Sequence, residues 1–245
     1  MTATAGHLDQ PGAQGSAACS PVQTVLWGQV QSVLLDLDGT LLDLHFDNHF
    51  WNEHLPLRFA AIRGLPREQA LAEVRRRIEA GRGTLAWYCL EHWGRELELD
   101  LLALEREVQH LIRAHPDVPR VLAALRAAGK RVVLVSNGHA GSLALKLERT
   151  RLAEHFHRVI CAHQLGLPKE QTAFWGRLAT VEPFAPARTL LVDDNPEVLR
   201  SARRFGIAHL LLARRPDSTR PTADSEEFAG IVALAELLPI AVREP

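Results

Sequence analysis

Cysteine is scarce in this sequence of 245 residues, with only Cys19, Cys89 and Cys161. An odd, widely spaced set without a CxxC pair excludes a disulfide framework and a cysteine-rich zinc site, and it suits a reducing compartment. No apolar run approaches the roughly 18 residues of a membrane span. The first residues also lack the basic and apolar regions of a signal peptide. We therefore expect a cytoplasmic protein.

Net charge is almost absent as well, because 28 Lys and Arg oppose 29 Asp and Glu to leave a formal charge of −1. This balance gives no electrostatic steering toward nucleic acid or an acidic membrane, so we expect neither as a partner. Only three of the 28 basic residues are lysines, namely Lys130, Lys146 and Lys169. Each lysine therefore raises the question of why an arginine does not stand there.

Residues 1–24 are rich in small and polar residues and in Pro, which predicts a disordered tail because such a stretch cannot bury enough apolar surface. Beyond the tail, strand-like apolar runs take turns with helical patterns. The expected strands are residues 33–40, 131–135, 158–161, 189–192 and 207–213. The expected helices between them are residues 121–128, 142–151, 169–180 and 196–205. This alternation predicts an α/β fold with a Rossmann-like parallel sheet.

The segment from Asp47 to about His115 has helical periodicity but no strand pattern. We expect it to be one all-helical insertion that follows the first strand. The predicted organisation is thus a disordered tail over 1–24, an α/β core over 25–46 and 116–245, and a helical cap over 47–115.

Polar side chains follow three of the apolar strands, at the edge where the carboxyl ends of parallel strands meet and where ligands bind in such sheets. A lysine at the start of the expected helix 169–180 joins them. The full set is Asp36, Asp38, Ser136, Asn137, Lys169, Asp193 and Asp194.

A single Asp after a strand most often caps a helix or forms a turn. Four acids gathered on one rim, however, repel one another unless a cation lies among them. Ligands that are all oxygen indicate Mg²⁺, which often bridges protein carboxylates and a substrate phosphate. A lysine on the same rim would hold an anionic ligand as a point charge. The sequence therefore predicts a Mg²⁺ site beside an anion site.

These residues, in this order, resemble the four motifs of the haloacid dehalogenase (HAD) superfamily, and the resemblance runs from about Val30 to Leu238. It implies a HAD-like core with a helical cap inserted after the first strand. It also implies that Asp36 attacks phosphorus to form an aspartyl-phosphate, and that Asp38 serves as general acid and then as general base.

The same resemblance implies roles for the other residues of the rim. Ser136 and Lys169 would hold the phosphoryl oxygens, and Asn137 would help to orient the site. Mg²⁺ would be bound by Asp36, by the backbone carbonyl of Asp38 and by Asp193. Asp194 would be an auxiliary residue of the metal site.

The acid at position 38 favours a phosphomonoesterase over the dehalogenase branch, which displaces halide without needing a proton. The phosphonate-cleaving branch uses a cap lysine, and residues 41–129 contain none. Stretches such as residues 41–51, 84–89 and 167–170 resemble the purine 5′-nucleotidases of the superfamily that act on GMP and IMP. The alternatives are a sugar-phosphate or phosphoglycolate phosphatase and, more remotely, a phospho-accepting receiver module. The expected partner is a small phosphate ester.

Several further residues allow two interpretations. Trp51, Trp87 and Tyr88 could contact substrate or pack within the cap, and His139 could approach the substrate from the second motif. Lys146 is expected to have a structural role, with contact to a substrate anion as the alternative.

Two groups in the cap are expected to have no part in the site. His45 and His49 have a spacing that can bind zinc, but no Glu completes the pattern. The arginine run 75–77 is expected to be a solvated helix face.

Overall fold

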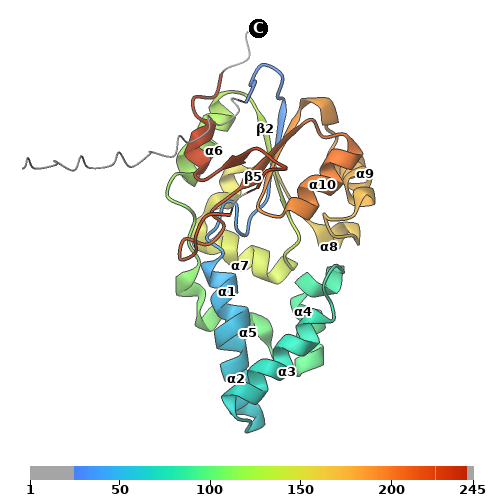
Figure 1. The fold of residues 1–245 in the computed structure, drawn as a ribbon. Helices are drawn as coiled ribbons and strands as arrows, with labels where there is room; N and C mark the ends of the chain where they lie inside the picture. Colours follow the sequence, from blue (N-terminus) through green and yellow to red (C-terminus); the bar gives the residue numbers. More distant parts are fainter. Residues whose placement is uncertain (1–24, 224, 242–245) are drawn as a thin grey trace, which may run out of the picture.

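The computed structural model describes residues 25–223 and 225–241, and the tail predicted over 1–24 lies outside the described residues. A parallel sheet of six strands forms the centre of the described part (Figure 1). The strands are β1 (Ser32–Leu35), β2 (Arg131–Ser136), β3 (Arg158–Cys161), β4 (Thr189–Asp193), β5 (His209–Ala213) and β6 (Gly230–Ile231). Their order, β3-β2-β1-β4-β5-β6, is that of a Rossmann-like fold. The predicted α/β class is therefore confirmed.

Helices cover both faces of the sheet, because strands β1 to β5 carry apolar side chains on both sides. Val33 and Leu35 of β1 pack in one apolar cluster with helices α6 and α7, whereas Leu34 packs in a second cluster with α9 and α10. The core helices and 3-10 turns are α6 (Val118–Ala127), α7 (Ala140–Thr150), η4 (Leu152–His155), α8 (Ala162–Leu165), α9 (Thr172–Val181), η5 (Pro186–Arg188), α10 (Pro196–Phe205) and η6 (Leu234–Leu237).

Several predicted boundaries in the core are wrong. The strand expected over 33–40 ends at Leu35, because the chain turns after it and the Leu41 and Leu42 N–H groups donate to the Leu37 carbonyl. The helices expected from 121 and 142 begin earlier, at Val118 and Ala140. The helix expected from Lys169 begins at Thr172, because Gln171 is extended and the Lys169 N–H donates 2.9 Å to the Asn137 side-chain oxygen. Lys169 thus lies in the loop before α9 and not at the amino end of a helix. The strand expected from Ile207 begins at His209, because the Ile207 N–H is still bonded to a carbonyl of α10.

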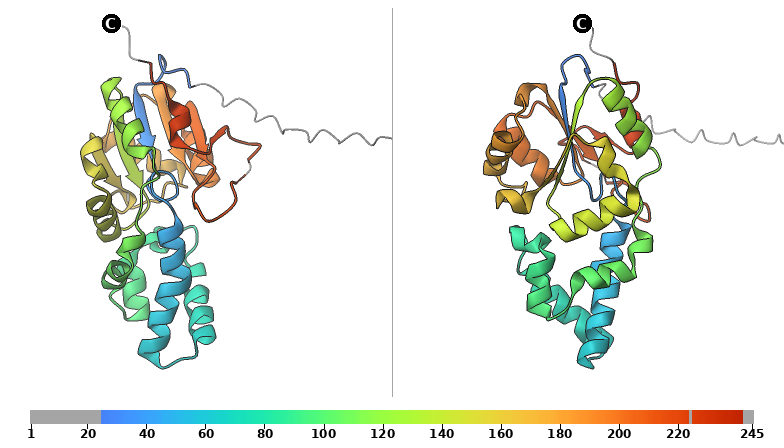
Figure 2. Two further views of the ribbon diagram at one scale, coloured as in Figure 1. Left: turned by 90° about the vertical axis from the view of Figure 1, so that its left-hand side faces the viewer. Right: turned by 180° about the vertical axis from the view of Figure 1, so that it is seen from behind.

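A helical segment lies between β1 and α6 and extends away from the core (Figures 1 and 2). It contains α1 (His45–His49), the π-helical turn η1 (Phe50–His54), α2 (Leu55–Arg63), α3 (Arg67–Glu79), η2 (Leu85–Tyr88), α4 (Leu90–Leu97), α5 (Leu101–Glu107) and η3 (Gln109–Leu111). The insertion after the first strand is thus confirmed, whereas the cap boundaries at 47 and 115 stay a prediction. No helix of the described residues is long and apolar enough to cross a membrane.

Local sequence signals set the ends of the cap helices. Gly64 ends α2 in the left-handed region at φ 64°, which glycine adopts without strain. Asp100 begins α5, since its carboxylate accepts a hydrogen bond of 3.0 Å from the Ala103 N–H.

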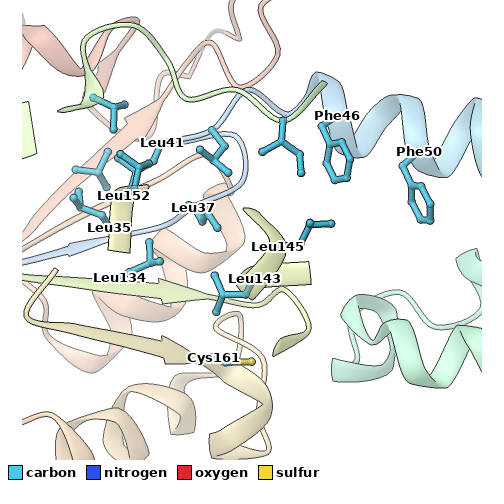
Figure 3. Close-up of a cluster of buried hydrophobic side chains, with 14 of the residues drawn as sticks. Leu35, Leu37, Leu41, Phe46, Phe50, Leu134, Leu143, Leu145, Leu152 and Cys161 are labelled. Carbon is cyan, nitrogen blue, oxygen red and sulfur yellow. The ribbon is translucent and has the colours of Figure 1, made fainter. Parts of the chain in front are cut away.

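Two neighbouring linkers join the cap to the core. The Asp43 N–H donates to the Arg113 carbonyl, and the His115 N–H donates to the Leu41 carbonyl, at 2.9 and 3.0 Å. From this double linker, α1, η1 and α2 continue as one rod (Figure 2). Phe46 and Phe50 extend the apolar cluster of the core along this rod (Figure 3). The cap is therefore packed onto the core through this rod of α1, η1 and α2, which we call the stem.

We expect Phe50→Ala to lower the free energy of unfolding by about 3–5 kcal/mol, because this ring is fully buried and its removal leaves a cavity. Leu57→Ala is the matched control, since Leu57 lies nearby in α2 but is 50% exposed. The control should change stability by only about 0.5 kcal/mol or less. Urea unfolding of both variants measures the difference, and equal losses would contradict this role of the stem.

Candidate active site

The candidate site lies at the point where the strand order reverses around β1. Because β2 and β4 flank β1 on opposite sides, their carboxyl ends open a crevice there. Asp36 directly follows β1, and its N–H donates 3.1 Å to the Val192 carbonyl of β4. Asp193 is the last residue of β4. The two carboxylates thus lie side by side at the crevice.

Lys169 joins these two carboxylates. Its ammonium donates to Asp36 Oδ1 and, at 2.7 Å, to Asp193 Oδ2. The lysine is only 2% exposed, and its own carbonyl accepts a hydrogen bond from the Ser201 hydroxyl of α10. Burial alone would lower the pKa of Lys169, but Asp193 and Asp36 together raise this pKa above its ordinary value. Lys169 therefore stays charged.

Three carboxylates crowd the crevice, since one oxygen each of Asp36, Asp193 and Asp194 lies within 4.8 Å of the others. Burial raises the pKa of Asp36 to about 7, against the opposing effect of Lys169. Burial and the neighbouring Asp36 and Asp193 carboxylates hold the pKa of Asp194 well above its ordinary value. The negative charge in this crevice is thus incompletely compensated by protein groups.

This donor set fits Mg²⁺, which binds carboxylate oxygens. Both Asp193 oxygens have protein partners, because Oδ2 accepts from Lys169 and Oδ1 accepts 2.9 Å from the Asn195 N–H. Asp194 borders Gly39 so closely that a Cβ on this glycine would lie 2.5 Å from Asp194 Oδ2. Gly39 also has φ 89°, which an L side chain rarely adopts. The glycine therefore allows Asp194 to approach the loop after Asp38.

The loop after β2 forms the next part of the rim. The Ser136 hydroxyl accepts 3.0 Å from the Gly138 N–H, and the Asn137 side chain donates 3.0 Å to Glu170. Asn137 also accepts from the Lys169 N–H, so this amide connects the loop after β2 with the loop between α8 and α9. Glu170 in turn accepts 3.2 Å from the Asn195 side chain. The predicted residues Ser136, Asn137 and Lys169 are thus brought together on one rim.

A second buried lysine lies beside Asp38. Lys146 of α7 donates 2.8 Å to Asp38 Oδ1 and 2.7 Å to Asp47 Oδ1 of the cap. Burial raises the pKa of Asp47 to about 6, although Lys146 acts in the opposite direction. Glu105 of α5 is close by, and burial raises its pKa to about 7. Acidic groups of core and cap therefore share this lysine.

A cavity of about 1030 Å³ connects the rim with the cap. Its cap wall includes Trp51, Asn52, Glu79, Arg82, Trp87 and Tyr88. Arg75 and Arg76 are exposed, as expected of a solvated helix face, and they also border this cavity. They face the cavity because α3 packs with its small residues inward, with Ala70 and Val74 buried.

Two further contacts join the cap to the core, one from η2 and one from α4. The Tyr88 hydroxyl donates 2.5 Å to Glu170, the carboxylate that also orients Asn137. Burial and then Glu170 raise the pKa of Tyr88 above its ordinary value. His139 lies 3.6 Å from Glu91 of α4 and caps α7 through its Nδ1. Tyr88 and His139 thus have structural partners while they also border the cavity.

Three polar residues at this site were not predicted from the sequence as members of it, namely Glu105, Lys146 and Glu170. The rarity of lysine was the available signal for Lys146, because both other lysines are also buried, at 4% and 2% exposure. Glu105 lies on the same buried side of its helix as Leu101 and Leu104, and it is itself 1% exposed. A charged residue on the buried face of a helix is unusual unless it has a partner.

The chain matches the model of the haloacid dehalogenase-like hydrolases over residues 30–206, and these residues include the whole rim. The chain belongs to this family. The predicted enzyme class, a hydrolase, is thereby confirmed.

Curated relatives and solved structures agree with this membership. A GMP/IMP nucleotidase (YrfG) of Escherichia coli is 38% identical over 194 residues, which cover 79% of this chain and 87% of the relative. A phosphoserine phosphatase of Thermus thermophilus is 27% identical over 113 residues, or 45% of each chain. A HAD phosphatase of Thermococcus onnurineus has the same fold, with a TM-score of 0.69 and 22% identity over 85% of this chain and 96% of its own.

The carboxylate cluster predicts a stabilising effect of Mg²⁺ that depends on pH. Because the folded-state pKa of Asp36 is about 7 and its ordinary value is 3.8, the metal-free protein loses stability as the pH rises between these values. Mg²⁺ needs the ionised carboxylates, so its effect should grow over the same window. At about ten times its Kd it should add ~1.4 kcal/mol at pH 8, or a few degrees in the thermal midpoint.

Thermal unfolding with and without Mg²⁺ at pH 5 and pH 8 measures this effect. Asp194→Asn should abolish the increment at pH 8, whereas Asp117→Asn, which lies outside the cavity lining, should retain it. An increment that is equal at both pH values would contradict the proton competition.

Proposed function

We propose that the protein is a Mg²⁺-dependent phosphomonoesterase that acts through an aspartyl-phosphate on Asp36 and hydrolyses purine nucleoside 5′-monophosphates. The observation that supports it most directly is the juxtaposition of Asp36, Lys169 and three carboxylates at the reversal point of the sheet. The relatives named as a nucleotidase and as a phosphatase agree with a phosphoric monoester as substrate.

In the first step, an oxygen of the Asp36 carboxylate forms a bond to phosphorus. The ester P–O bond breaks, and its electron pair goes to the leaving oxygen, which takes a proton from Asp38. The products are an alcohol, an aspartyl-phosphate and an ionised Asp38. Lys169 and Ser136 hold the phosphoryl oxygens from two sides of the rim, which stabilises the charge of the transition state.

In the second step, a water molecule attacks the phosphorus of the aspartyl-phosphate. Asp38 accepts the proton of this water, and the bond between phosphorus and Asp36 breaks. Inorganic phosphate and the Asp36 carboxylate result, and Asp38 again carries its proton. One nucleophile and one proton carrier thus complete the cycle.

Asp36, the backbone carbonyl of Asp38 and the pair Asp193 and Asp194 would hold Mg²⁺. When bound, this ion neutralises the charge between the nucleophile and the phosphate that it attacks. Asp193 would also orient Lys169, because its two oxygens accept hydrogen bonds from Lys169 and from the Asn195 N–H.

The cap wall supports a purine leaving group. Trp87 and Trp51 line the cavity, and stacking of a base on an aromatic side chain contributes about 1–3 kcal/mol. The Arg82 guanidinium lies 4.9 Å from the centre of the Trp87 ring and is held by Glu79 at 2.5 and 3.0 Å. Arginine is the side chain that best matches the O6 and N7 acceptors of a guanine base. Hypoxanthine presents the same two acceptors, whereas adenine presents an amino group at position 6.

Asp36→Asn should abolish turnover of every phosphate ester while the fold is retained, because an amide cannot form the aspartyl-phosphate. Phosphate release is measured with GMP in excess Mg²⁺, and circular dichroism checks the fold. Asp117→Asn, outside the cavity lining, should keep wild-type activity. Near-normal turnover by folded Asp36→Asn would disprove the mechanism.

Arg82→Met should narrow the preference for GMP over AMP in kcat/KM by roughly 5- to 150-fold, the equivalent of about 1–3 kcal/mol for a paired arginine contact. The measurement compares GMP, IMP, AMP and a sugar phosphate. Arg67→Met is the matched control, because Arg67 begins α3 outside the cavity lining. Wild-type protein that prefers sugar phosphates would refute the nucleotide substrate and leave the phosphatase proposal standing.

A further inference from the structure

Lys146 is a buried ammonium that the proposed reaction does not use. It is 3% exposed, and it lies in α7, the helix that follows the Ser136 loop. Its two hydrogen bonds, to Asp38 and Asp47, connect groups that are 108 and 99 residues away in the sequence. The centre of the Phe46 ring lies 5.3 Å from its ammonium. Such a group is costly to bury unless its partners hold it firmly.

The contacts of Asp38 divide its carboxylate into two different oxygens. Oδ1 accepts the hydrogen bond from Lys146 at 2.8 Å. Oδ2 lies on the other side, toward the loop after β2, which we call the phosphate loop. A Cβ built on Gly138 of this loop would lie 3.5 Å from Asp38 Oδ2 and 3.2 Å from the Ser136 hydroxyl. One oxygen is thus held by the lysine, and the other faces the place where the phosphoryl group would be.

The cap contributes the second anchor of the lysine. Asp47 lies in α1, directly after the double linker, and its Oδ1 accepts from Lys146 at 2.7 Å. Glu105 of α5 is a further cap carboxylate near this lysine, and it accepts a hydrogen bond of 2.9 Å from the Ser142 hydroxyl of α7. An ammonium donates in three directions, whereas a guanidinium donates in one plane, so a lysine suits these diverging partners.

We propose that Lys146 is a positioning residue for Asp38: it fixes Oδ1 against the cap carboxylate Asp47, so that Oδ2 faces the phosphate loop for proton transfer. This inference rests on the proposed function, because it assigns Asp38 the proton that goes to the leaving oxygen. In that step Oδ2–H gives its proton to the leaving oxygen while the P–O bond breaks, and Asp38 is left as a carboxylate held by Lys146.

A purely structural lysine and a positioning lysine differ in one measurable property. Proton donation matters for an alcohol leaving group, such as the 5′-oxygen of a nucleotide, but little for a nitrophenolate. The ratio kcat/KM includes only steps up to release of the leaving group, so hydrolysis of the aspartyl-phosphate does not affect it. A loss of stability or of folded protein would lower kcat/KM for both kinds of substrate equally.

The test compares GMP with p-nitrophenyl phosphate for the wild type, Lys146→Met, Asp38→Asn and the double variant, all with saturating Mg²⁺. We expect Lys146→Met to lower kcat/KM for GMP by roughly 10²-fold and for the aryl phosphate by less than about 3-fold. In the Asp38→Asn background, Lys146→Met should cause no further loss with GMP. Equal losses on both substrates, or independent losses in the double variant, would overturn the proposal.

Lys130→Met is the matched control for the removal of a buried ammonium. Lys130 is 4% exposed and donates 2.7 and 2.9 Å to the Trp27 and Val30 carbonyls, away from the cavity lining. It should lower stability without changing the ratio between the two substrates. If Lys146→Met does not fold, Asp47→Asn serves instead, since it keeps the lysine and removes only the negative charge of the cap anchor. This variant should lose several-fold more activity on GMP than on the aryl phosphate.

The outcomes separate this inference from the proposed function. If the wild type hydrolyses neither substrate, the phosphomonoesterase proposal fails. If the wild type is active and Asp38→Asn shows the leaving-group dependence, but neither Lys146→Met nor Asp47→Asn does, only the role of Lys146 is refuted.

Discussion

Buried carboxylates repel one another, and compensation of this repulsion is the constraint on which the site depends. The reversal of strand order around β1 forces Asp36 and Asp193 into contact range, and Asp194 follows directly. Two ammonium groups compensate this negative charge. Lys169 lies between the core carboxylates, and Lys146 lies between a core and a cap carboxylate. Each lysine also fixes its carboxylates in position. The same contacts therefore compensate the negative charge and set the geometry of the site.

Much of the core could be predicted from the sequence, because a strand buried on both faces is a continuous apolar run and the carboxyl ends of such strands share one edge. The strand patterns around Val33, Val133 and Leu191 therefore located the rim. Helix starts were harder to predict. The expected helix 169–180 began at Lys169. The N–H of this residue is instead bonded to Asn137, a partner on another loop that no local pattern reveals.

The cap side of the site could be predicted only in part. Asp38 and Lys146 are joined across 108 residues, and such a pair depends on how α7 packs against the stem. Glu105 occupies a position of an apolar helical pattern. Periodicity alone predicts that such a position is buried in the core, and it does not indicate a place in a polar site. Arg75 and Arg76 are solvated, as the charge run predicts, but the sequence cannot show that a cavity lies beside them. Tertiary packing decided each of these positions.

The placement of the three lysines has a consequence for the chemistry of the protein surface. All three side chains are at most 4% exposed, and arginine supplies the other basic side chains. Guanidinium groups keep their charge at any pH that the fold survives, so the positive charge of the surface side chains varies only through histidine. Reagents that acylate or alkylate primary amines meet no exposed lysine on the folded chain. The rate at which these three side chains become modified therefore reports how often the core opens.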